Sequence, residues 1–167
     1  MRGCPGSQPM LFLLEPAACT GPFFSVWRPE LVALRASFRL PRHPAQIVVS
    51  KRGRLDFDAL LFNVPELRVY LLAGDECVAR HESAIGARPW VRAICLDDDL
   101  GLALERLRLE EGIQRISAIG GRFTATQLVD AGLTQDIYLT TTSLEGGEQS
   151  IEYANTSSAS PARAISS

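Results

Sequence analysis

Short apolar runs alternate with amphipathic helical patterns through the middle of this chain. The run Gln46–Val49 is β-branched and predicts a buried strand, as in parallel sheets, and the other short apolar runs also predict strands. Helical patterns separate several of these runs, an order typical of α/β proteins. The predicted strands are Gln46–Val49, Leu67–Ala73, Val91–Leu96, Ile116–Ile119 and Ile137–Thr141.

The clearest helical pattern covers Leu100–Glu110. Three acidic residues, Asp97–Asp99, precede it, and carboxylates at that position favour capping of the helix. A cation site is the alternative, but it needs ligands from elsewhere in the fold. The apolar residues recur at i, i+3, i+4 and i+7, which predicts one face packed on the sheet: Leu100, Ala103, Leu104 and Leu107.

A shorter helix is predicted over Arg28–Phe38, with Leu31, Leu34 and Phe38 on one side. The prolines of Pro41–Pro44 end the pattern. The preceding residues, 1–28, contain glycine, proline and aromatic residues without a sustained period. We therefore expect residues 1–38 to be an irregular or diverged segment before the main domain.

A pair of glycines, Gly120-Gly121, separates the strand Ile116–Ile119 from a helical pattern that Gly132 ends. With the strand Ile137–Thr141 this forms a strand–turn–helix–strand unit, which favours parallel pairing with a right-handed crossover. Glycines allow a ligand to approach the backbone closely, and the following helix N-terminus favours an anion such as a pyrophosphate. A tight turn without a ligand is the alternative for so short a motif.

The region of about residues 40–147 resembles the reductase domain of riboflavin biosynthesis, the C-terminal domain of the bifunctional deaminase-reductase family. That family has a dihydrofolate-reductase-like fold. Arg122 replaces the proline that usually follows the glycine pair, as in the Gly-Gly-Arg of dihydrofolate reductases. The matching elements are the strand Ile116–Ile119, Gly120-Gly121, Ala131-Gly132-Leu133, Asp136 and Gly146-Gly147.

This resemblance implies an α/β fold with a mostly parallel open sheet and flanking helices. It also implies NADPH as cofactor and hydride transfer to the ribosyl group of a 5-amino-6-(5-phosphoribosylamino)uracil-like pyrimidine. The residues that it implies at the cofactor pyrophosphate are Gly120, Gly121, Arg122, Phe123 and Thr124.

Ser50, Lys51 and Arg52 follow the strand Gln46–Val49. In open α/β sheets, ligands bind beyond the carboxyl ends of the strands. The resemblance implies that this turn contacts the 2′-phosphate that distinguishes NADPH from NADH. A solvated basic turn is the alternative, because exposed Lys and Arg commonly occupy loops.

The chain also departs from the family pattern. It contains no Ser-x-Asp-Gly signature, so the fold is expected to be incomplete at the N-terminus and no catalytic residue is assigned. We expect a reductase-like domain over residues 39–154 and a flexible tail over residues 155–167. The alternatives to a reductase are a catalytically silent nucleotide-binding or interaction module, a fragment without the substrate-binding strand, and a flavin- or deazaflavin-dependent reductase.

Composition narrows the class of protein. With 167 residues, 46% hydrophobic content and a net charge of −2, the chain fits one soluble domain without a nucleic-acid surface. Its four cysteines form no CxxC pair, and no metal site is predicted. The apolar run Met10–Leu14 is too short to span a bilayer and does not resemble a signal peptide. We expect a cytoplasmic protein without membrane or nucleic-acid partners, and a homodimer by analogy with the family.

Overall fold

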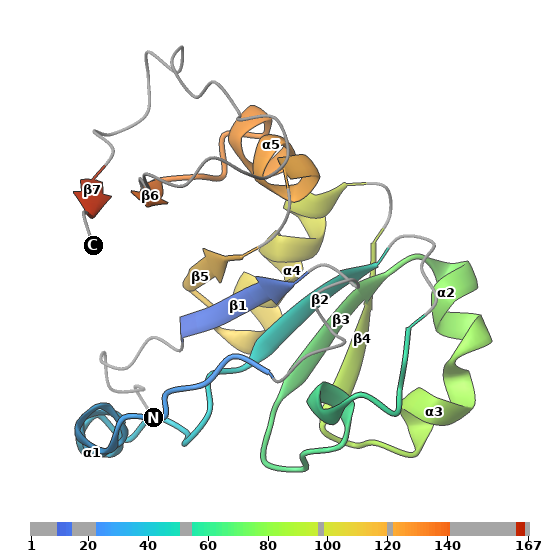
Figure 1. Ribbon diagram of the computed structural model, residues 1–167. Coiled ribbons are helices and arrows are strands. Elements are labelled where there is room, and N and C mark those ends of the chain that lie inside the picture. The colour runs from blue at the N-terminus through green and yellow to red at the C-terminus, as the bar shows by residue number, and fades with distance from the viewer. Residues whose placement is uncertain are drawn as a thin grey trace, which may run out of the picture. The chain divides into compact units, whose positions relative to one another are not determined.

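The computed structural model describes residues 10–14, 23–50, 55–96, 99–119, 122–140 and 163–165. The chain divides into two compact units, Met1–Gly120 and Gly121–Ser167. The first unit contains a five-stranded sheet in the order β4-β3-β2-β1-β5, and all its pairs are parallel (Figure 1). Its strands are β1 Met10–Leu14, β2 Gln46–Ser50, β3 Val69–Ala73, β4 Val91–Cys95 and β5 Arg115–Ala118.

Helices connect these strands, so the predicted α/β class with a parallel open sheet is confirmed. No helix in the described part of the chain is both long and apolar enough to cross a bilayer. In the second unit, α5 Arg122–Asp130 is followed by β6 Tyr138–Thr140 and β7 Arg163–Ile165, which pair in parallel. The helices of the first unit are α1 Pro29–Ser37, η2 Leu60–Phe62, α2 Asp75–Arg80, α3 Glu82–Gly86 and α4 Leu100–Glu111.

Strand β3, between β4 and β2, is buried on both faces: its side chains alternate across the sheet, and all five are buried. Val69 and Leu71 pack into an apolar cluster with residues of the 55–64 segment, α2 and α3. Tyr70 points to the opposite face, where α4 covers the sheet (Figure 1). A strand between two apolar layers has no polar face, which explains the uninterrupted apolar run in the sequence.

Helix α4 packs on the sheet as its periodicity predicts. Ala103 and Leu107 are buried, and Leu100 and Leu104 are half-buried. Gly112 ends the helix with a left-handed φ of 68°, a conformation that glycine adopts without steric cost.

Residues 1–38 contain two regular elements. The helix predicted over Arg28–Phe38 is confirmed as α1, whereas β1, which was not predicted as a strand, lies between β2 and β5 in the sheet. With five apolar residues, β1 has the length of an ordinary strand. It supplies a strand at the N-terminal part of the fold, where the sequence predicted none. The compact units divide after Gly120 rather than after residue 38, and the predicted boundary after residue 154 lies outside the described residues.

The predicted parallel pairing of β5 with the next strand is also wrong. Strand β5 pairs with β1, whereas β6 pairs with β7. Strand β7 lies within the tail that was expected to be flexible. The apolar pattern predicts that a segment is a strand, but its partner depends on which strand edges the tertiary structure leaves available.

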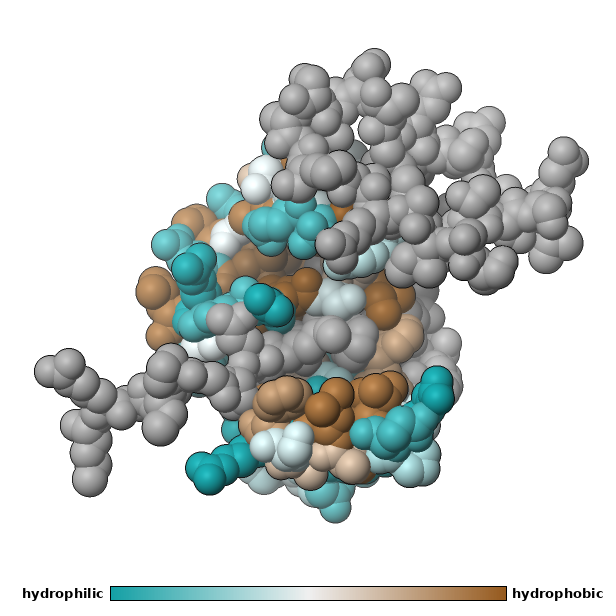
Figure 2. Space-filling model, turned by 90° about the vertical axis from the view of Figure 1, so that its left-hand side faces the viewer, coloured by the Kyte–Doolittle hydropathy of each residue, from teal (hydrophilic) through white to brown (hydrophobic). Residues whose placement is uncertain are grey.

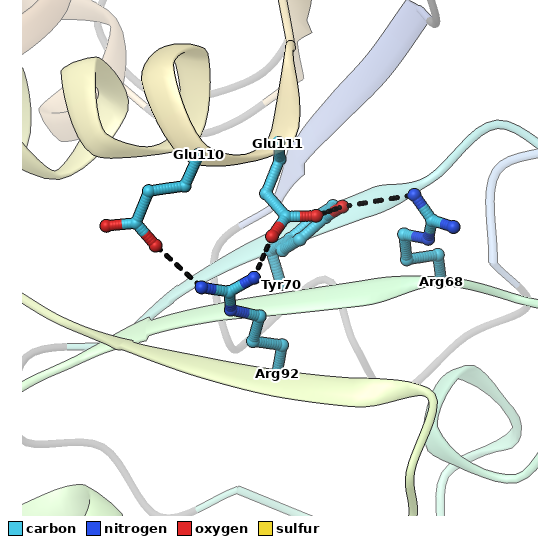
Figure 3. A network of polar contacts seen from close by, with 5 residues as sticks. All are labelled: Arg68, Tyr70, Arg92, Glu110 and Glu111. Atoms are coloured by element: carbon cyan, nitrogen blue, oxygen red, sulfur yellow. Dashed lines mark hydrogen bonds and ion pairs between the residues drawn. The ribbon is translucent and has the colours of Figure 1, made fainter.

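A polar network fixes the C-terminal end of α4 to the sheet (Figure 3). The hydroxyl of buried Tyr70 donates a hydrogen bond of 2.6 Å to Glu111, and Arg68 contacts the same hydroxyl. Arg92 on β4 forms ion pairs with Glu111 and Glu110. The side chain of Glu111 is only 14% exposed, whereas that of Glu110 is 46% exposed. Water therefore screens the contacts of Glu111 less than those of Glu110.

We predict that Tyr70→Phe lowers the free energy of unfolding by about 1–2 kcal/mol, because it removes a donor from a largely buried carboxylate. Glu110→Gln is the control, with an expected loss of about 0–1 kcal/mol, because its ion pair is half exposed. Urea denaturation measures both. An equal loss in the two variants would contradict the buried contact as the stabilising part of this network.

A cluster of rings joins the segment before α1 to the segment before β2. His43 Nδ1 lies 2.6 Å from the Ser25 hydroxyl, and its ring packs edge-on against Phe23 at 5.1 Å. The guanidinium of Arg42 lies over the ring of Trp27. Burial, followed by the positive charge of Arg42, lowers the pKa of His43; Arg35 acts in the same direction, and Glu66 opposes it.

We predict that this cluster weakens on acidification. The unfolded chain binds a proton at His43 near pH 6.5, but the folded chain binds it only at lower pH, so the free energy of unfolding falls as pH drops below about 6.5. Urea midpoints at about pH 7.5 and pH 5.5 measure the change for wild type and for His43→Gln, which stays neutral. If the free energy of unfolding falls equally in wild type and in His43→Gln, groups other than His43 cause the change.

Candidate functional site

The carboxyl ends of the strands form one edge of the sheet in the first unit. Ser50 of β2 pairs with Ala73 of β3, and Ala73 pairs with Cys95 of β4. The chain leaves this edge through Gly74 into α2 and through residues 96–99 into α4. Ligands of open α/β sheets bind beyond such an edge, so this is the candidate site.

Ser50 and Cys95 are each in register with Ala73 between them, so the three side chains point to the same face of the sheet. This is the face that α2 covers. The Ser50 side chain is buried. The Cys95 thiol lies 3.1 Å from the Asp75 carboxylate in the first turn of α2. This part of the edge therefore combines a hydroxyl, a thiol and a carboxylate.

A hollow of about 220 Å³ opens beside the end of β4 and the outer side of α4. Leu102 and Leu109 line it, and both lie outside the predicted core face of the helix. The sequence shows that these two leucines lie outside the core face of α4. That pattern identified no site until the fold placed Cys95 beside them. Its lining also includes Asp99, Ala103 and Arg106.

Helix N-termini attract anions, but acidic residues there cancel the attraction. The first turn of α2 contains Asp75 and Glu76. At α4, the Asp99 carboxylate accepts hydrogen bonds from the backbone N–H groups of Gly101 and Leu102, at 2.8 and 3.3 Å. The first turn of α5 contains no acidic residue. Of these three helices, α5 alone has an N-terminus whose residues fit a phosphate.

The predicted cofactor residues are distributed over both compact units. Ser50 ends β2, and Thr124 lies buried in the first turn of α5. Arg122 and Phe123 begin the same helix. The remaining predicted residues lie outside the described part of the chain: Lys51, Arg52, Gly120 and Gly121. Their contacts with a cofactor therefore stay predictions.

The two histidines are both partly buried in contacts within the first unit. His43 belongs to the ring cluster before β2, and His81 is half-buried, with its Nε2 accepting from the backbone N–H of Leu55 at 3.4 Å. Its ring also packs near Phe57. Both histidines therefore join segments that are distant in the sequence. Within the described residues, no cluster of three or more His, Cys, Asp or Glu side chains could hold a metal ion.

Comparison with solved structures identifies the architecture. A crystal structure of a pyrimidine reductase-like protein from Corynebacterium diphtheriae matches with a TM-score of 0.59 and 19% sequence identity. The chain shares the fold of this protein. The match covers 74% of the chain but 54% of that protein, so the chain spans about half its length. It confirms the dihydrofolate-reductase-like fold expected from the resemblance in the sequence.

No protein-family model and no curated protein matches the chain.

We predict that Asp99→Ala lowers the free energy of unfolding by about 1 kcal/mol, because it leaves two backbone donors of α4 without their cap. Asp99→Ser retains an acceptor oxygen and should lose only a small part of this. Thermal denaturation of the three proteins provides the test. Equal destabilisation by both substitutions would show that the cap is not the stabilising contact of Asp99.

Proposed function

We propose that this chain is an NADPH-dependent reductase domain of the riboflavin-pathway type. Its substrate is a phosphorylated pyrimidine similar to 5-amino-6-(5-phosphoribosylamino)uracil, whose ribosyl group is reduced by hydride transfer. The fold shared with a pyrimidine reductase-like protein supports the class of reaction. The substrate follows from the resemblance in the sequence.

The N-terminus of α5 carries the proposal. It follows the Gly120-Gly121 pair in the sequence and has no acidic residue in its first turn. Backbone N–H groups at such a position are suitable donors for the cofactor pyrophosphate. The same turn contains the hydroxyl-bearing residue Thr124 and the positively charged residue Arg122.

The turn after β2 is the second part of the proposal. Ser50 ends this strand at the carboxyl edge of the sheet, and Lys51 and Arg52 follow it directly in the sequence. Two cations and a hydroxyl have the chemistry to bind the 2′-phosphate of NADPH. NADH lacks this phosphate, so these residues would determine the choice of cofactor.

The bound nicotinamide supplies the hydride, and the protein contributes binding, orientation and exclusion of water. These roles need no nucleophile or metal, and we assign no catalytic residue. In this proposal the residues at the start of α5 would bind the pyrophosphate, and those after β2 would bind the 2′-phosphate.

A catalytically silent nucleotide-binding module is the second candidate. The absence of the Ser-x-Asp-Gly signature favours it, because that signature belongs to the substrate side of the family. This candidate retains cofactor binding and loses substrate reduction. Cofactor affinity and turnover therefore have to be measured separately.

We predict that the purified chain binds NADPH more tightly than NADH. Lys51→Ala/Arg52→Ala should weaken NADPH binding by about tenfold or more, because it removes charge-assisted contacts to the 2′-phosphate. The affinity for NADH should not change. Titration of nicotinamide fluorescence measures both affinities.

Arg108→Ala on α4 is the matched control, because it removes a positive charge from an exposed helix position. It should leave both affinities unchanged. A folded protein that binds neither nucleotide would refute cofactor binding. NADPH binding without reduction of the phosphoribosylaminopyrimidine would select the silent module.

A further inference from the structure

Helix α1 buries none of its residues. Four large apolar side chains in and beside it are substantially exposed: Trp27 at 63%, Leu31 at 43%, Leu34 at 50% and Phe38 at 57%. Leu31 and Leu34 lie on α1 and Phe38 is its C-cap residue, so their spacing of three and four residues places them along one side of the helix, and Trp27 lies just before the N-cap residue Arg28. We call these four residues the α1 stripe. Figure 2 shows hydrophobic side chains gathered over α1, low in the view, with hydrophilic side chains on both sides.

Within the stripe, Trp27 contacts the rings of Phe23 and His43 and the guanidinium of Arg42. Val32 and Arg35 are half-buried, and Arg35 donates two hydrogen bonds to the carbonyl of Pro41. A helix of nine residues is marginal in water, and most helical stability in proteins comes from packing of an apolar face. Leu31, Leu34 and Phe38 form the apolar face of α1 and are 43–57% exposed among the described residues, so a partner that covers them would stabilise the helix.

The charge around α1 indicates the kind of partner. Residues 27–43 contain four arginines and one glutamate, a net charge of +3 with neutral histidine. The whole chain carries −2, so the remaining residues carry −5. Arg28 forms an ion pair with Glu30, so Arg35, Arg39 and Arg42 supply the net positive charge around the stripe. An acidic partner therefore complements this surface.

We propose that the α1 stripe binds an acidic amphipathic helix of a partner protein. The narrow line of four apolar residues fits helix-on-helix packing at 3.5-residue spacing. A second copy of this chain would bring two surfaces of +3 together. A helix lying in a membrane interface buries a broader apolar face. This proposal is independent of cofactor binding.

The test uses the full chain and a synthetic acidic helix of about three heptads, with Leu at a and d and Glu at e and g. Wild type should bind it, as measured by calorimetry, and Leu34→Ser should weaken binding by about tenfold or more. Leu60→Ser is the matched control, because Leu60 is 53% exposed on η2 and should leave binding unchanged. The same peptide with Lys in place of Glu should not bind.

Several outcomes would overturn the proposal. The proposal fails if folded wild type does not bind the acidic peptide. It also fails if Leu34→Ser and Leu60→Ser lose the same amount of peptide affinity. A wild-type dimer by light scattering that Leu34→Ser converts to monomer would assign the stripe to a second copy. Stripe-dependent binding to phosphatidylserine vesicles without peptide binding would assign it to a lipid surface. Circular dichroism verifies that each variant is folded.

Discussion

The burial of β3 between two apolar layers is the constraint on which the first unit depends. Every residue of this strand is buried, and the neighbouring strands β2 and β4 pair with it along its whole length. A parallel strand buried on both faces cannot leave the sheet without exposing apolar side chains, and a shift by one residue would turn the Tyr70 hydroxyl away from Glu111 into the apolar cluster. The register of β3 therefore determines which residues reach the carboxyl edge together.

The N-termini of α2, α4 and α5 differ in their suitability for an anion. The acidic first turn of α2 and the Asp99 cap of α4 make these helix N-termini unsuitable for a phosphate. The first turn of α5 lacks such residues. The distribution of carboxylates, rather than the presence of helix N-termini alone, thus selects the glycine pair before α5 as the candidate for the pyrophosphate.

The helices α4 and α1 differ in how many contacts attach them to the rest of the first unit. A carboxylate cap fixes the beginning of α4, Ala103 and Leu107 bury its middle, and the Tyr70–Glu111 contact fixes its end. Helix α1 has no side-chain cap and no buried residue, although its apolar positions are as regular. The same periodicity therefore accompanies a core helix in one case and an exposed surface in the other.

The sequence by itself determined the strands β2 to β5, the helices α4 and α5, the core face of α4, and the α/β class, but it did not predict η2, α2 and α3. Apolar runs, helical spacing and capping residues act locally, so their effects can be predicted without the fold. Only the tertiary structure decided that Met10–Leu14 lies inside the sheet, that β5 pairs with β1, and that β6 pairs with β7. It also decided the exposure of Leu31, Leu34 and Phe38, and it brought Cys95 beside Asp75. These features depend on contacts between residues far apart in the chain, which no local pattern specifies.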